Sequence, residues 1–199
     1  PEFVWYTLGG NDMADSDQHH KCLKTAKNDA EAQACVKAAS DVAKACTNEL
    51  LEPFFKKFPK SKVLQINYDV PCESSLCDST VVNNFMGGAY CASDKTCQNQ
   101  LGVYWSSVYV EQLHKDYAKS YPGQYTGLNI FGTVQQANGI EGASPGHPVM
   151  DQDAGDCKVL HEILCIHPTY GTKMATAIGE QFWLQFFSKY ISTENATVV

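Results

Sequence analysis

Residues 3–12 read Phe-Val-Trp-Tyr-Thr-Leu-Gly-Gly-Asn-Asp, and this stretch decides how the fold is interpreted. Residues 3–8 are mainly aromatic and β-branched, a composition typical of a buried strand. Gly9 and Gly10 then end the strand, because two glycines permit a tight turn. We therefore expect Asn11 and Asp12 to follow the carboxyl end of a buried strand.

The rest of the chain alternates between helical and extended patterns. Apolar residues at three- and four-residue spacing predict helices, and short β-branched runs predict strands. The order strand, helix, strand, helix, strand, helix predicts an α/β fold with a parallel sheet covered by helices. The predicted strands are 3–8, 62–67 and 125–133. The predicted helices are about 29–58, 105–117 and 171–190. The predicted loops or irregular segments are 11–28, 68–102 and 135–156.

The helix predicted at 29–58 carries a repeating apolar pattern. Pro53 is expected to kink or restart it, because proline lacks the N–H that the helix needs. In the polar loop before it, we interpret His19 and His20 as solvated residues rather than metal ligands. The residues of the pattern are Cys35, Ala38, Ala39, Val42, Ala45, Cys46 and Leu50.

Composition excludes several classes of protein. The chain has 199 residues, 44% of them hydrophobic and 19% charged, which is typical of one globular domain rather than a disordered segment. Its net charge of −7, without a basic stripe, predicts neither a nucleic-acid partner nor an anionic membrane partner. No apolar run is long enough to predict a membrane span, and no motif predicts a metal ion or a cofactor.

The chain contains nine cysteines, without the paired spacing of a zinc site. Spacings of five, six and eight residues, as in Cys72/Cys77, Cys91/Cys97 and Cys157/Cys165, suit short disulfide loops in a secreted, extracellular protein. We expect Cys22 to bond to Cys35, which leaves Cys46 as the candidate unpaired thiol. The sequon at Asn195 is in line with a secreted glycoprotein.

Two short motifs carry the candidate chemistry. An Asn side chain at a strand end, as at Asn11, offers an N–H donor to a developing oxyanion, although Gly, Asn and Asp are also common turn residues. His167, followed by Pro168 and the last helix, could serve as a general base or be an ordinary loop histidine. Tyr68, Tyr90 and Tyr170, in loops near strand ends, are candidates for ligand contact.

Together these motifs resemble the SGNH (GDSL-type) hydrolase family. The resemblance runs from Val4 to about Tyr190 and implies a three-layer α/β/α flavodoxin-like fold. It implies ester hydrolysis through an acyl-enzyme, with Asn11 in the oxyanion hole and His167 as the base. Gly10 and Asp12 would then belong to the substrate-binding turn.

The family's Gly-Asp-Ser motif does not occur in this sequence, and Leu164 stands where the family usually has an Asp. We therefore expect residues 4–199 to be a single domain that lacks N-terminal strands, after a cloning scar at residues 1–3. The nucleophilic serine would precede this chain. A separate N-terminal fragment or a swapped dimer partner would complete the sheet.

Three functions remain open from the sequence. The first is an esterase or lipase acting on a small-molecule, lipid or acetylated-carbohydrate ester. The second is a catalytically inactive binding or structural protein of the same fold, which the missing serine and Leu164 favour. The third is a disulfide-rich extracellular interaction module.

Overall fold

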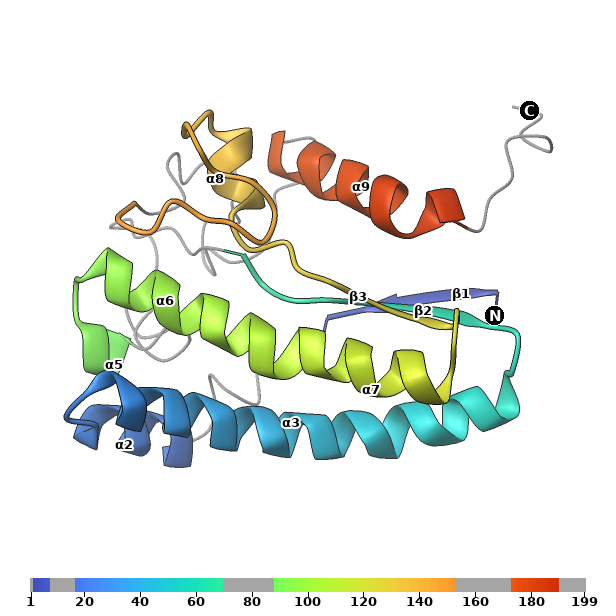
Figure 1. Cartoon of the computed structure of the whole chain (residues 1–199), viewed down its shortest axis with the longest axis horizontal. Helices are drawn as coiled ribbons and strands as arrows, with labels where there is room; N and C mark the ends of the chain where they lie inside the picture. The colour runs from blue at the N-terminus through green and yellow to red at the C-terminus, as the bar shows by residue number, and fades with distance from the viewer. Residues whose placement is uncertain (1, 8–16, 70–87, 153–172, 190–199) are drawn as a thin grey trace.

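The computed structural model of this chain describes residues 2–7, 17–69, 88–152 and 173–189. Within these ranges the chain forms a parallel sheet between layers of helices (Figure 1). The elements are β1 (Phe3–Tyr6), α2 (Asp17–Thr25), α3 (Asp29–Lys57), β2 (Lys62–Ile66), α5 (Gly88–Cys91), α6 (Lys95–Ser106), the π-helical segment η1 (Ser107–Glu111), α7 (Gln112–Ser120), β3 (Tyr125–Leu128), α8 (Thr133–Ala137), α9 (Lys173–Gln185) and the 3-10 turn η3 (Phe187–Lys189).

The three described strands are parallel, in the order β1-β2-β3. Val4 is in register with Val63, and Val63 is in register with Tyr125. The predicted α/β fold with a parallel sheet is thus confirmed, although β1 and β3 are shorter than expected. The first strand was wrongly predicted to be buried: β1 lies at the edge of the described sheet, and Trp5 is 60% exposed.

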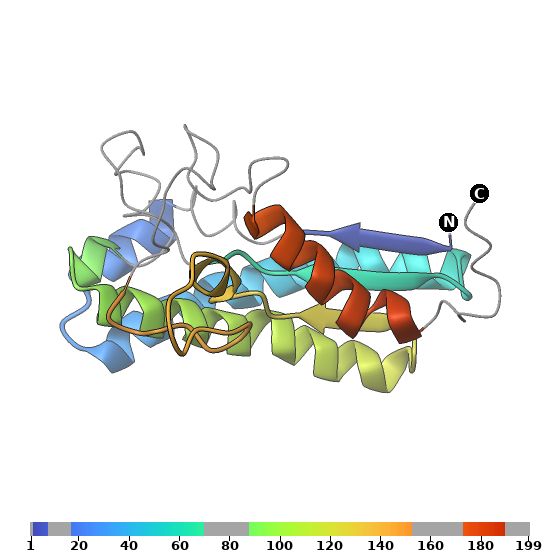
Figure 2. The same ribbon diagram turned by 90° about the horizontal axis from the view of Figure 1, so that it is seen from above.

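Helices cover both faces of the sheet (Figure 1). Seen from above, α3 runs beneath β1 and β2, α7 lies beneath β3, and α9 crosses the opposite face (Figure 2). Ile178 of α9 is buried, and so is Phe186, which follows α9 and meets the ring of Phe3 edge-on at 5.9 Å. The last predicted helix is therefore confirmed as the cover of the second face.

Helix α3 confirms the long predicted helix but buries a different face. The Asn28 side chain caps it by accepting a hydrogen bond from the Glu31 N–H, and the helix continues through Pro53 to Lys57. The buried face includes two hydroxyl side chains, Ser40 and Thr47. Its residues are Ala32, Cys35, Val36, Ser40, Ala43, Thr47, Leu51 and Phe55.

Hydrogen bonds made by the two hydroxyls explain why polar side chains can occupy the buried face of α3. Ser40 and Thr47 donate to the carbonyls of Val36 and Ala43, one turn earlier, so neither hydroxyl is buried without a partner. Thr47 also bonds to the Tyr109 hydroxyl at 2.9 Å. A pattern based on apolar residues alone therefore assigns the wrong side of α3 to the core.

Three predicted loops contain helices. Residues 17–25 form α2, where His19 and Leu23 are buried against α3, so the prediction of solvated histidines was wrong for His19. Residues 88–91 and 95–106 form α5 and α6, and Asp94 caps α6 by accepting from the Cys97 N–H at 3.1 Å. Helix α8 occupies the start of the third predicted loop.

Two disulfides hold these short helices in place. Cys22 is bonded to Cys35, as predicted, and the bond joins α2 to α3. Cys91 is bonded to Cys97, which joins α5 to α6. Of the cysteines that the structure describes, Cys46 has a free, exposed thiol, as expected. Cys72, Cys77, Cys157 and Cys165 lie outside the described residues.

Helix α7 packs against β3, and one of its side chains bonds to the strand. The Gly127 N–H donates to Nδ1 of His114 at 3.3 Å, and the imidazole stacks on Tyr125. Burial lowers the pKa of His114, and the nearby Lys189 lowers it further. A neutral imidazole is what this bond requires, because a protonated Nδ1 cannot accept.

The histidines predict an acid-sensitive fold. Burial also lowers the pKa of His19 from its ordinary 6.5. Because the folded chain binds fewer protons than the unfolded chain below pH 6.5, stability present above that pH is lost as the pH falls. Urea unfolding should therefore show a falling free energy between about pH 7 and 5. His114→Gln, which keeps an acceptor but does not titrate, should weaken this dependence; an unchanged dependence would contradict the role of His114.

Gly127 predicts a second, steric effect. A Cβ at this position would lie 3.0 Å from Cγ1 and from the carbonyl oxygen of Val110. Gly127→Ala should therefore lower the free energy of unfolding by about 1–3 kcal/mol, the usual range for overpacking. The control is Gly179→Ala in α9, where a Cβ meets nothing within 4 Å and helix propensity favours alanine by up to about 1 kcal/mol. Equal effects at both glycines would refute the packing argument.

Candidate functional site

Most of the predicted site residues lie outside the part of the chain that the structure describes. Gly10, Asn11 and Asp12 fall within residues 8–16, and His167 and Tyr170 fall within residues 153–172. What the structure does describe is the carboxyl edge of the sheet, where β1, β2 and β3 end. In a parallel α/β sheet, ligands bind outside this edge.

Two of the predicted contact residues are described: Tyr90 lies in α5 and donates to Asp29 at 2.8 Å, and Tyr68 lies directly after β2. Its side chain is 8% exposed, and its ring stacks on the Trp105 indole with centroids 6.2 Å apart. Its described surroundings are thus core, between the end of β2 and α6. The residues on either side of it, Asn67 and Asp69, carry the polar structure of the edge.

Asn67 joins three segments at the end of β2. The side chain is 1% exposed. Its Oδ1 accepts from the Ile130 N–H at 2.8 Å, and its Nδ2 donates to Oδ1 of Asn129 at 3.1 Å and to the hydroxyl of Ser106. The end of β2, the end of β3 and α6 are therefore held in one fixed arrangement.

Asp69 performs a similar role two residues later. Its two carboxylate oxygens accept from the Gly132 N–H at 2.5 Å and the Val134 N–H at 2.8 Å. These amides belong to the turn into α8, where N–H groups have no partner within the helix. Gly132 has φ +96°, and a Cβ there would lie 2.8 Å from the Ser144 carbonyl oxygen. Only glycine therefore fits this turn without strain.

Two buried amide side chains hold the loop that follows α8. The Val149 N–H donates to Oε1 of Gln135, and Nε2 of Gln135 donates to the carbonyls of Val149 and Gln152. Nδ2 of Asn99 donates to the carbonyls of Met150 and Gln152, at 2.9 and 2.8 Å. The loop is thus fixed up to residue 152, next to the segment that contains His167.

These four polar side chains are scaffold groups rather than acid–base groups. Each is buried, and each uses its amide or carboxylate on backbone groups of nearby loops, so it has a structural task already. The sequence contained a signal for two of them: Asn67 ends the strand predicted at 62–67, and Asp69 follows two residues later. Asn99 and Gln135 carried none, because each acts on a loop far away in the sequence.

Histidine 19 is also structural in its described contacts. Its imidazole is 3% exposed and lies near the backbone of Cys35. The adjoining Cys22 is a disulfide partner and so is not available as a metal ligand. Among the described residues, no group of three or more His, Cys, Asp and Glu side chains is arranged to bind a metal ion.

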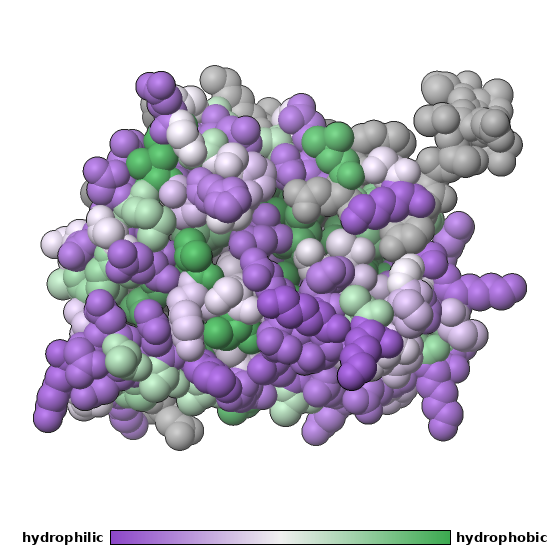
Figure 3. Space-filling model, in the orientation of Figure 1, coloured by the Kyte–Doolittle hydropathy of each residue, from purple (hydrophilic) through white to green (hydrophobic). Residues whose placement is uncertain are grey.

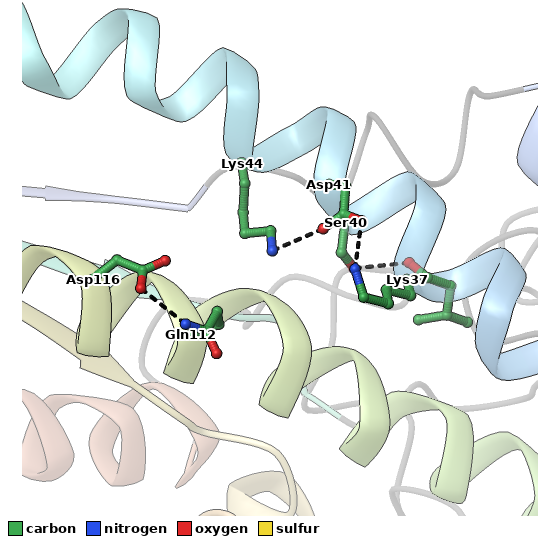
Figure 4. Close-up of polar contacts among 7 residues, drawn as sticks. Lys37, Ser40, Asp41, Lys44, Gln112 and Asp116 are labelled. Atoms are coloured by element: carbon green, nitrogen blue, oxygen red, sulfur yellow. Dashed lines mark hydrogen bonds and ion pairs between the residues drawn. The ribbon is translucent and has the colours of Figure 1, made fainter.

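A polar groove of about 400 Å³ lies between α3 and α7. Two of its acidic groups have partners: Asp41 bonds to Lys37 at 2.6 Å and to Lys44 at 2.8 Å, and Asp116 accepts from Gln112 (Figure 4). The two lysines lower the pKa of Asp41. The surrounding face is mostly hydrophilic (Figure 3). None of the predicted site residues lines this groove.

The hydrogen bonds of Asp69 at the carboxyl edge predict that a conservative substitution of this residue lowers the free energy of unfolding. In Asp69→Asn the new NH₂ group faces one of two backbone N–H donors, so one bond is lost at a buried position. The free energy of unfolding should fall by about 1–3 kcal/mol. Asp151→Asn, at an exposed position of the loop that follows α8, should change it by less than about 0.5 kcal/mol. Urea titration compares the two; equal changes would refute the role of Asp69.

Comparison with known proteins adds no relative to these observations. No protein-family model matches the sequence, no curated protein matches it, and no solved structure matches it.

Proposed function

We propose that this chain is the C-terminal part of a secreted SGNH-type ester hydrolase with a flavodoxin-like fold. The proposal is supported most by the positions of the end of β1 and the start of α9, which lie at the same end of the molecule and adjoin the segments that carry Asn11 and His167. The segment with Asn11 follows β1 at the carboxyl edge of the sheet, and the segment with His167 leads into α9, which begins beside α8 at the same end of the molecule (Figure 1).

Chain length is compatible with a shared site. Asn11 is four residues beyond Thr7, and His167 is six residues before Lys173. Since an extended residue spans at most about 3.5 Å, these side chains can reach about 14 and 21 Å from the described chain. The fixed turns at Asn67 and Asp69 provide a rigid base from which such loops can be positioned.

Each residue has a defined role in the proposed reaction. His167 removes the proton from a serine hydroxyl that residues upstream of this chain contribute. The serine oxygen then attacks the ester carbonyl, and the Asn11 amide N–H donates to the oxyanion. His167 returns the proton to the departing alcohol, and water releases the acid from the acyl-enzyme.

The substrate class follows from this chemistry. It is a carboxylic ester, either of a small molecule, of a lipid or of an acetylated carbohydrate, and the proposed roles require no cofactor. Gly10, Asp12, Tyr68 and Tyr170 are the proposed substrate contacts. For Tyr68 this requires a rearrangement, since its ring is packed on Trp105.

A separate N-terminal fragment or a swapped dimer partner would supply the serine. None of the described helices has the length and hydrophobicity needed to cross a bilayer.

A binding protein of the same fold is the second candidate. Leu164 stands three residues before His167, where the resembled family has an aspartate that orients the base. Without that carboxylate and without a serine, Asn11 and His167 could bind an oxygen-rich ligand but not turn it over.

Hydrolysis of a para-nitrophenyl ester separates the two candidates. This chain alone should show no serine-dependent turnover. The natural protein, with the residues that precede this chain, should hydrolyse the ester, and His167→Ala should lower kcat by about 10²–10⁴-fold, the usual worth of a general base. His147→Ala, at an exposed loop position, should leave kcat unchanged.

One result would contradict the upstream position of the serine, and another would contradict the hydrolase activity itself. Turnover by this chain that a serine-directed phosphonate abolishes would mean that the nucleophile lies within residues 1–199. A natural protein that binds esters but does not hydrolyse them would support the binding protein instead.

A further inference from the structure

The two described disulfides differ in their surroundings. Each contains one buried residue, Cys35 at 4% exposure in Cys22–Cys35 and Cys91 at 7% in Cys91–Cys97. Cys91 and Cys97, however, both line a surface groove of about 370 Å³ beside Tyr90. The groove therefore gives a small reagent room to approach the second disulfide.

The loop that Cys91–Cys97 closes contains a strained residue. Ala92 has φ +50°, and among the described residues it is the one residue other than glycine with a positive φ. This left-handed region is unfavourable for a residue that has a Cβ. The disulfide holds Ala92 there, together with a hydrogen bond from the Gln98 side chain to the Ala92 carbonyl. Opening the disulfide therefore lets Ala92 leave the left-handed region.

Helix α5 also depends on its disulfide more than α2 does. α2 buries Leu23 fully against the core, so it keeps Cys22 beside Cys35 when that bond is open. α5 lies between α2 and α6 (Figure 1) and has only four residues, too few for a helix to persist alone. The hydrogen bond from its Tyr90 hydroxyl to Asp29 is exposed, and exposed hydrogen bonds add little stability. Loss of Cys91–Cys97 therefore has a larger local effect.

We propose that Cys91–Cys97 is an exchangeable disulfide that a small dithiol reduces at the groove, and that its reduction releases α5 from α6 while the rest of the described fold stays intact. α5 is the first described element after Asp69 at the carboxyl edge of the sheet. The redox state of this bond therefore decides whether the chain is held to α6 at this point.

The charge of the groove indicates the class of reductant. Its two carboxylates are Asp29, which accepts from Tyr90 at 2.8 Å, and Asp94, which accepts from the Cys97 N–H at 3.1 Å. Among the described residues that line the groove there is no lysine or arginine. Since like charges repel, an uncharged dithiol such as dithiothreitol suits this groove better than an anionic thiol.

The exchange balances in electrons and protons. One thiolate of the dithiol attacks the sulfur of Cys91 and expels Cys97, whose thiolate in the first turn of α6 is the better leaving group. The second thiolate attacks the reductant's own sulfur in the mixed disulfide, which releases the Cys91 thiolate and leaves a cyclic disulfide. Two electrons pass from the dithiol to the protein. The dithiol gives two protons to solvent, and the two cysteines take up two.

A dithiol titration tests the order of reduction. Protein is equilibrated with mixtures of reduced and oxidised dithiothreitol, quenched with acid, alkylated at its free thiols and digested with trypsin. Cys97 is the single cysteine of the tryptic peptide 96–115, and Cys35 is the single cysteine of 28–37, so the two bonds are measured separately. Half-reduction at Cys97 should need at least about fivefold less dithiol than at Cys35, the smallest factor that the left-handed cost of an alanine gives.

Limited proteolysis tests the release of α5. When Cys97 is reduced and Cys35 is not, chymotrypsin should cleave after Tyr90 at least about tenfold faster, because cleavage follows the population of the open form. Cleavage after Tyr104, in α6, should not change, and circular dichroism should show an intact fold. Cys91→Ser with Cys97→Ser should fold and be cleaved after Tyr90 as fast as the reduced protein.

Two glycine variants test the strain. Ala92→Gly, which adopts a positive φ without cost, should raise the dithiol needed for half-reduction at Cys97 by about fivefold. Ser93→Gly, at the next residue of the same loop, where φ is not positive, should not raise it. The proposal is overturned if Cys35 is reduced as readily as Cys97, if reduction leaves cleavage after Tyr90 unchanged or unfolds the whole chain, or if the two glycine variants behave alike.

Discussion

Three backbone N–H groups after β3, those of Ile130, Gly132 and Val134, need partners, and two side chains beyond β2 provide them. Asn67 accepts from Ile130, and Asp69 accepts from Gly132 and Val134. A buried backbone N–H group without a hydrogen-bond partner lowers the stability of the fold by more than a typical hydrogen bond raises it. This arrangement fixes the turn after β3, the start of α8 and, through Gln135, the loop up to residue 152. The carboxyl edge is therefore a rigid base for the segments that carry Asn11 and His167.

Polar groups also decide the packing beneath the sheet. Ser40 and Thr47 lie on the buried face of α3 because each hydroxyl bonds to a carbonyl of its own helix. Tyr125, on the sheet face above, donates to Gln65 of β2, and burial raises the pKa of its hydroxyl, which stays protonated at ordinary pH. The core therefore contains hydroxyl groups that a hydrophobicity pattern assigns to the surface.

Much of the fold could be predicted from the sequence, and the failures have physical reasons. The parallel α/β order, the long helix at α3 and the Cys22–Cys35 bond follow from periodicity, composition and spacing, which are local signals. Helices α2 and α5 were missed because both are short, α2 is mostly polar, and a disulfide holds each of them to the next helix. The orientation of α3 was missed because it depends on tertiary contacts.

The candidate site was less predictable than the fold. Asn67 and Asp69 follow a strand at the expected edge, so position alone could have indicated them. Asn99 acts on a loop fifty residues away, which no local pattern reveals. The roles of Asn11 and His167 rest on the family resemblance, and they remain predictions because both residues lie outside the described structure.

The bond between His114 and Gly127 has a consequence for self-association. Exposed strand edges are templates for intermolecular pairing, and proteins avoid aggregation by covering them. A protonated imidazole can no longer accept from Gly127, so acid that protonates His114 leaves one N–H of β3 without this partner, while β1 is already an edge of the described sheet. That N–H adds to the strand groups that can pair with other molecules, which favours fibrous or amorphous precipitates in acidic solution.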